Sequence, residues 1–140
     1  MLHLMKLAVG VTDAAHLRAL QGARLAHEGR LIHRTRNFPR RAGEVRDGGS
    51  MFWVLAGAMV IRQKIADIVD DTLPDGRRCA AIVLDPGLIA VAARLIRPFQ
   101  GWRYLAADDA PMDIAASQQA DGETAIPEEL RQKLRLLGLL

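Results

Sequence analysis

The stretch SMFWVLAGAMVIRQKIADIV, residues 50–69, decides the fold class. Its first part is rich in large and branched side chains, and its second part alternates between apolar and polar residues, so both are typical of β-strands. Gly57 stands between the two parts, where a tight bend or bulge is expected. The pattern predicts strands over residues 50–56 and 58–69. The second strand is expected to carry Met59, Ile61 and Ile65 on one face and Arg62 and Lys64 on the other.

The flanking sequence adds more strands and a helix. Residues 13–28 carry a helical apolar stripe between Thr12, a suitable N-cap, and Gly29, a suitable C-terminal glycine. A short helical turn is expected over residues 40–46. Residues 88–96 fit either a strand or a helix, and a loop is expected over residues 70–77 and after residue 84. The remaining strands are expected over residues 2–9, 30–37, 79–84 and 99–105.

These elements predict an α+β fold, a small mixed β-barrel or curved sheet with an N-terminal helix and a C-terminal helix. The chain of 140 residues fits a single domain, expected over residues 1–105. An acidic linker is expected over residues 106–126, with at most a helical turn near residues 110–114. Pro127 then begins a helix over residues 127–140, which is expected to dock on the domain.

The charges are divided along the chain. The 19 Lys and Arg residues outnumber the 16 Asp and Glu residues, for a net charge of +3. Residues 1–103 carry 16 of the basic residues and 9 acids, whereas residues 104–130 carry 7 acids and no base. A basic body favours anionic partners such as RNA, nucleotides or other phosphate-bearing ligands. Folding of the acidic stretch over the basic face, in competition with such a ligand, is a further possibility.

The densest basic segment runs from Arg30 to Arg46 and holds six arginines. Arginine presents a planar set of donors that fits phosphate and carboxylate oxygens. We therefore expect a binding face for RNA or another anionic ligand, with aromatic side chains available to stack on bases. The alternatives are arginines that pair with nearby acids and aromatics that only cover the core. The candidate binding residues are His33, Arg34, Arg36, Arg40, Arg41, Arg62, Trp102 and Arg103.

Two other function classes stay open. His33, Ser50 and Asp85 are candidates for a small enzyme acting on a nucleotide or nucleic acid, although no partner completes an acid–base pair. The segment DGGS, residues 47–50, fits a plain turn better than a phosphate-binding loop, since it lacks the Walker ending. A protein-assembly module is the third reading, with the leucine stripe of the last helix as its surface. That stripe consists of Leu130, Leu134 and Leu137.

Several site classes are not expected. The four histidines show no metal-ligand spacing with each other or with cysteine, so neither a metal nor a cofactor is predicted. Cys79 is the single cysteine and opens an apolar run, which is typical of a buried structural residue. The longest uncharged run, residues 48–61, is too short to cross a membrane. A cytoplasmic protein without a membrane partner is therefore expected.

The sequence resembles an uncharacterised alphaproteobacterial family, the domain of unknown function numbered 1489. The likeness covers nearly the whole chain and implies a bacterial cytosolic origin, without any assigned activity. Phe52 and Ala56 depart from the pattern, where the family suggests Tyr and Lys. The matching segments are Thr35-Arg36, Pro39-Arg40-Arg41, Asp47 to Val54, Arg62-Gln63, Leu84-Asp85-Pro86 and Phe99 to Leu105.

A fainter likeness concerns the order of elements. A short helix, a basic Thr-Arg segment and a run of curved strands are similar to PUA-type RNA-binding domains, including the ASCH and EVE branches. The likeness implies an RNA ligand by analogy of fold.

Overall fold

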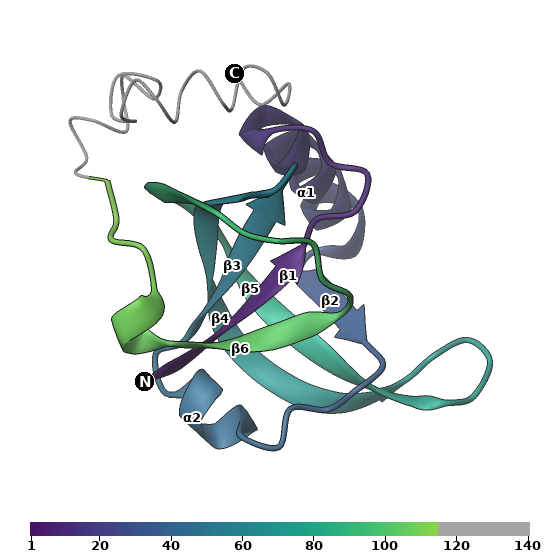
Figure 1. Ribbon diagram of the computed structural model, residues 1–140. Coiled ribbons are helices and arrows are strands. Elements are labelled where there is room, and N and C mark those ends of the chain that lie inside the picture. Colours follow the sequence, from purple (N-terminus) through teal and green to yellow (C-terminus); the bar gives the residue numbers. More distant parts are fainter. Residues whose placement is uncertain (115–140) are drawn as a thin grey trace.

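The computed structural model describes residues 1–114, which form one six-stranded mixed sheet and two helices (Figure 1). The sheet order is β2-β5-β4-β3-β1-β6. Strands β1 and β3 pair in parallel, and the other neighbours pair antiparallel. The α+β class is therefore confirmed. The strands are β1 (Leu2–Leu7), β2 (Leu31–Thr35), β3 (Ser50–Leu55), β4 (Ala58–Thr72), β5 (Arg78–Leu95) and β6 (Trp102–Ala106).

The hairpin of β3 and β4 confirms the bend predicted at Gly57. Ala56 and Gly57 have φ angles of 45° and 89°, which a two-residue primed turn requires. The register then shifts, because Val54 pairs with Met59 while Trp53 pairs with Ile61. This bulge turns Met59 to the face opposite Ile61, so the prediction that both share a face is wrong.

Strand β5 is longer than the sequence suggests. The turn-like residues 85–87 lie inside it, since Leu84 pairs with Ile65 and Leu88 pairs with Gln63. Three residues of β5 thus stand opposite one residue of β4, which bends the strand without ending it. The predicted loop over residues 70–77 is also too long, because β4 ends at Thr72 and β5 begins at Arg78.

The two helices lie at opposite ends of the curved sheet (Figure 1). Helix α1 (Ala14–Glu28) is capped by Asp13, whose carboxylate accepts the His16 backbone N–H at 2.7 Å, rather than by the predicted Thr12. Gly29 ends the helix in the left-handed conformation, as predicted. Helix α2 (Ala42–Arg46) is the short turn expected before β3.

The helices pack on one face of the sheet, which we call the inner face. Leu17 of α1 and Val45 of α2 join Leu4, Trp53 and Ile68 of the strands in the larger buried cluster. The opposite, outer face carries a smaller cluster. Its buried members are Phe52, Val54, Met59, Val91, Phe99 and Leu105.

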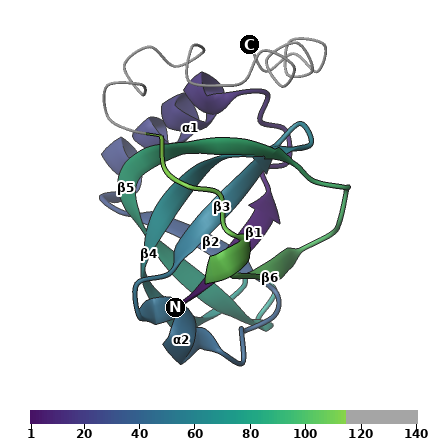
Figure 2. The ribbon, with the colours of Figure 1, turned by 60° about the vertical axis from the view of Figure 1, so that its left-hand side comes forward.

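Residues 107–114 pack on the outer face, which differs from the linker expected from residue 106. A 3₁₀ turn, Ala107–Asp109, follows β6, and the chain then runs along β5 (Figure 2). The Ala92 N–H donates to the Met112 carbonyl, and the Ile114 N–H donates to the Ala90 carbonyl. The remaining linker and the expected C-terminal helix lie outside the described residues.

The sheet is not closed into a barrel, so that form of the predicted fold is wrong and the curved sheet is correct. The edge strands β2 and β6 are not neighbours in the hydrogen-bonded order. Side-chain contacts join their ends instead. The Trp102 indole N–H donates to the Asn37 carbonyl at 3.2 Å, and the Tyr104 hydroxyl accepts the Arg41 backbone N–H at 3.1 Å. A space between these two edges follows from this arrangement.

Candidate functional site

An inner pocket of about 280 Å³ lies between α1 and the inner face. Its wall combines aliphatic side chains with a few polar and aromatic ones, which is typical of small-molecule sites. Leu17, Leu31 and Leu84 are among the aliphatic residues. The polar and aromatic lining residues are Lys6, Gln21, Arg24, His33 and Trp53.

An outer cleft of about 710 Å³ lies between the sheet edges. Strand β2 and the residues after it supply one wall, with Arg34 and Arg36, and the start of β6 supplies the other, with Trp102. Lys6 lines both spaces, so the inner pocket and the outer cleft adjoin at this residue. We refer to the two together as the joined cleft.

The joined cleft is positively charged. Neither lining set contains an Asp or Glu. Burial lowers the pKa of Lys6. The pKa of His33 falls to about 4, chiefly because the ring is buried and further because Lys6 and Arg24 repel a proton there. His33 is therefore neutral at pH 7, and an anion at Lys6 would relieve the repulsion.

His33 also has an unmet hydrogen-bonding group. Its Nε2 atom is buried and has no hydrogen-bond partner within the described residues. The ring stands edge to face with Trp53, with 5.3 Å between centroids and 88° between planes. Buried polar atoms are rarely left unpaired in native proteins, since the loss is about 1–3 kcal/mol. One residue of the pocket wall thus carries an unpaired polar atom.

Gln63 holds two side chains of the pocket wall, Trp53 and Gln21, through hydrogen bonds. It is fully buried, and its Oε1 accepts the Trp53 indole N–H at 3.0 Å. The amides of Gln63 and Gln21 exchange two hydrogen bonds, of 2.9 Å and 2.7 Å. The Gln63 amide also donates to the Asp85 carbonyl in the β5 bend. Gln21 and Trp53 are consequently held in place before any ligand arrives.

The structure brings four of the predicted binding residues to the joined cleft: His33, Arg34, Arg36 and Trp102. Arg34 is already paired, since its Nε donates to Asp71 at 2.7 Å. Arg36 is exposed at the cleft. Within residues 1–114, the cationic residues of this cleft that form no ion pair with a carboxylate are therefore Lys6, Arg24 and Arg36.

The other predicted arginines do not line the joined cleft. Arg41 pairs with Glu44 and lies 5.7 Å from the centre of the Tyr104 ring, and Arg103 covers the Phe99 ring at 5.0 Å. Arg40 is exposed after β2. Arg62 belongs to the outer face, where Phe52, its neighbour across the strands, is buried. These four arginines therefore lie outside the joined cleft, and Arg41 and Arg62 are already paired with acids.

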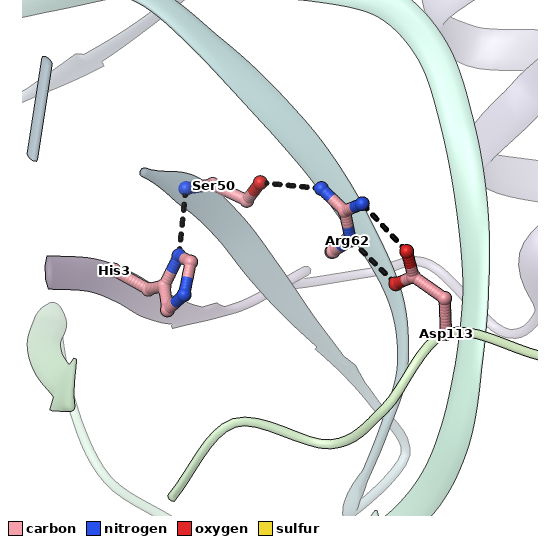
Figure 3. Close-up of polar contacts among 4 residues, drawn as sticks. All are labelled: His3, Ser50, Arg62 and Asp113. Carbon is pink, nitrogen blue, oxygen red and sulfur yellow. Dashed lines mark hydrogen bonds and ion pairs between the residues drawn. The ribbon is translucent and has the colours of Figure 1, made fainter. Parts of the chain in front are cut away.

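Arg62 takes part in a chain of polar contacts (Figure 3). Its guanidinium donates to both carboxylate oxygens of Asp113, at 2.6 Å and 2.7 Å, and to the Ser50 hydroxyl at 2.9 Å. The Ser50 backbone N–H donates to His3 Nδ1 at 2.9 Å. His3 thereby contacts the backbone of Ser50 and not its hydroxyl, so this geometry does not activate a serine nucleophile.

The residues named for an enzyme are not gathered. Ser50 and Asp85 do not line the joined cleft, and the Asp85 carboxylate accepts the Gly87 N–H within its own bend. The 47–50 segment is a structural turn, because the Gly49 N–H donates to the Val45 carbonyl and the Ser50 N–H donates to His3. These two amides are thus not available to a phosphate.

The described residues contain neither a metal-binding cluster nor a membrane-spanning helix. Within residues 1–114, no group of three or more His, Cys, Asp or Glu side chains is placed to hold a metal ion. Neither helix in that range is long and apolar enough to span a bilayer. Cys79 is buried, as expected.

Residues 4–140 match the family described as Protein of unknown function (DUF1489). The chain belongs to this family. No curated protein and no solved structure shows significant similarity to this DUF1489 member. The family assignment confirms the resemblance seen in the sequence and leaves the activity to be inferred from the site.

The sequence reasoning missed four residues of the inner pocket. Lys6, Gln21, Arg24 and Trp53 come from β1, α1 and β3, outside the arginine segment. Lys6 carried one available signal, since it is a charged residue inside an otherwise apolar central strand. The meeting of α1 with β2 across the pocket depends on tertiary packing and had no local signal.

Proposed function

We propose that this DUF1489 protein binds a phosphate-bearing ligand, with single-stranded RNA as the main candidate, in the joined cleft. The observation that carries the proposal is the convergence of Lys6, Arg24 and Arg36 on a cleft without a carboxylate. Burial makes an isolated cation costly unless an anion accompanies it, so a phosphate at Lys6 has a physical reason to bind.

The shape of the site favours a single strand over a duplex. The positive groups lie in a concavity between sheet edges, and the Trp102 side chain is half-buried at its border. Proteins that bind single strands combine such cationic grooves with aromatic rings on which bases stack. An RNA ligand also agrees with the predicted likeness to PUA-type domains. That likeness, the alphaproteobacterial origin and a cytoplasmic location without a membrane partner all stay predictions.

The test is RNA binding measured against salt. A fluorescently labelled single-stranded oligonucleotide of mixed sequence is titrated with protein at salt concentrations from about 25 mM to about 300 mM. Screening of phosphate contacts changes strongly over this range. Affinity should fall steeply with salt. The Lys6→Met and Arg36→Gln substitutions should weaken binding and flatten the slope.

Matched controls sit outside the joined cleft. Lys64→Met changes an exposed lysine on β4, and Arg40→Gln changes an exposed arginine near β2. Both should leave affinity within about twofold of the wild type. Absence of binding at low salt, or equal losses for the cleft and control variants, would reject the proposal.

A further inference from the structure

The inner pocket has two aromatic walls at a right angle. The His33 and Trp53 rings differ in orientation by 88°, with their centroids 5.3 Å apart. A flat ring that stacks on one of them must turn its edge toward the other. Such a corner fits a planar, aromatic ligand with polar atoms on its edge better than a flexible aliphatic one.

The unpaired polar atom of His33 suits a nucleobase. The neutral His33 ring is a donor at one nitrogen and an acceptor at the other, and Nε2 has no partner within residues 1–114. Base edges carry donors and acceptors side by side, so either tautomer of His33 finds a counterpart. The Trp53 N–H is already bonded to Gln63 and does not compete for the ligand.

The two parts of the joined cleft suit different parts of a nucleotide. Leu17, Leu31 and Leu84 make the inner pocket apolar, and its 280 Å³ is near the lower end of small-molecule sites, roughly 300–1,000 Å³. A phosphate there would lose its hydration among these leucines. The outer cleft, with Arg36 and with Lys6 at the junction, suits the phosphate instead.

We propose that the inner pocket receives the base of one unpaired nucleotide, whose phosphate lies at Lys6. The inference rests on the proposed function and adds to it the part of the ligand that enters the protein. It predicts that the protein recognises a nucleotide through its base as well as through its charge.

The test compares ligands that share a phosphate but differ in the base. Calorimetric titrations at low salt use inorganic phosphate, ribose 5-phosphate and the four ribonucleoside 5′-monophosphates. At least one nucleotide should bind about tenfold or more tightly than ribose 5-phosphate, since stacking of one base contributes about 1–3 kcal/mol. If the natural ligand is RNA, an oligonucleotide containing that base should bind more tightly than the mononucleotide. If the natural ligand is a free nucleotide, the two should bind equally.

Two substitutions separate base recognition from charge. His33→Phe keeps an aromatic ring and removes Nε2, and Val11→Trp adds bulk to the lining of the inner pocket. Each should reduce the preference for the nucleotide over ribose 5-phosphate by about tenfold, while ribose 5-phosphate itself binds as before. His27→Phe, which changes an exposed histidine of α1, is the matched control and should leave this preference unchanged.

The outcomes distinguish the two proposals. Equal affinity for ribose 5-phosphate and all nucleotides rejects the base pocket but keeps the phosphate site. No affinity for any phosphate compound or RNA rejects both. A preference for nucleotides that survives His33→Phe and Val11→Trp shows that the base lies elsewhere and also overturns the inference. The wild-type ligand series decides the first two outcomes even if a variant fails to fold.

Discussion

Arg62 of β4 holds Asp113 through two parallel hydrogen bonds, from Nε to Oδ1 at 2.6 Å and from Nη2 to Oδ2 at 2.7 Å. The first acidic residues after β6 thus fold back onto the body, and one of them neutralises an arginine that the sequence offers for RNA. This contact lies on the outer face, away from the joined cleft. The Arg62 guanidinium is therefore engaged by Asp113 and Ser50.

The first prediction concerns this ion pair. Asp113→Asn keeps the shape of the side chain and removes its charge, so Arg62 loses a charge-assisted pair. Because the carboxylate is 46% exposed, the loss of unfolding free energy should be modest, about 1 kcal/mol. Hydrogen exchange at the Ala92 and Ile114 amides should accelerate, since both bonds tie residues 107–114 to β5. Unchanged exchange at both amides would contradict the role assigned to the pair.

Gln63 gives a second prediction. Replacement by Leu leaves the Trp53 N–H, the Gln21 amide and the Asp85 carbonyl without their partner. Urea unfolding should show a loss of at least about 2 kcal/mol, because each buried unpaired group costs about 1–3 kcal/mol. Gln21→Leu should cost less, since Gln63 then keeps two of its partners. Equal effects of the two substitutions would show that the network is not centred on Gln63.

The third prediction compares alanine substitutions at two glycines, Gly49 and Gly22. A Cβ atom at Gly49 would lie 2.2 Å from the Leu2 carbonyl oxygen and 2.4 Å from that of Val45, both backbone atoms. Gly49→Ala should therefore destabilise the fold by at least about 3 kcal/mol. Gly22→Ala on α1 meets no atom within 4 Å and should stabilise by about 0.5–1 kcal/mol. Thermal unfolding of the two variants is the measurement, and a tolerant Gly49 would disprove the close approach.

The pH dependence of stability is the fourth prediction. The pKa of His33 is about 4 in the folded protein, against 6.5 for the free side chain. The unfolded chain then binds more protons than the folded one between pH 6.5 and pH 4. The part of the unfolding free energy that comes from neutral His33 is therefore fully present above pH 6.5 and is lost as the pH falls toward 4. At about 1.4 kcal/mol per pKa unit, the loss approaches 3 kcal/mol.

His33→Phe should remove that part of the pH dependence. The lowered pKa of His3 acts in the same direction and remains in the variant, so the comparison with the wild type isolates His33. Urea titrations at pH 4, 5.5 and 7 give the two slopes. Parallel stability curves for the two proteins would contradict the buried, neutral state of His33.

Local patterns were enough to predict most of the secondary structure. The Gly57 bend, the Gly29 cap and the strands on either side of residue 57 follow from backbone conformations that few residues adopt. The face of Met59 and the continuity of β5 did not follow, because bulges shift the register without a distinct residue signal. The Asp85-Pro86-Gly87 turn signal marked a bend inside a strand.

The candidate site was harder to predict than the fold. The arginine-rich segment marked Arg34 and Arg36 as binding candidates, yet its composition says nothing about which acids lie nearby. Asp71 and Asp113 are distant in the sequence and neutralise Arg34 and Arg62. Lys6 and Arg24 became part of the site only through the packing of α1 and the approach of the sheet edges.

The most direct test of the central claim is the pKa of the His33 ring, followed by NMR in the free protein and at saturation with the nucleoside 5′-monophosphate that binds best. The free protein should show a value of about 4. Burial is the chief cause of this low pKa, and repulsion from Lys6 and Arg24 is the smaller one. A nucleotide bound in the joined cleft alters both, so the pKa and the NMR signals of the His33 ring should change at saturation. An unchanged pKa together with unchanged ring signals would contradict binding in the joined cleft.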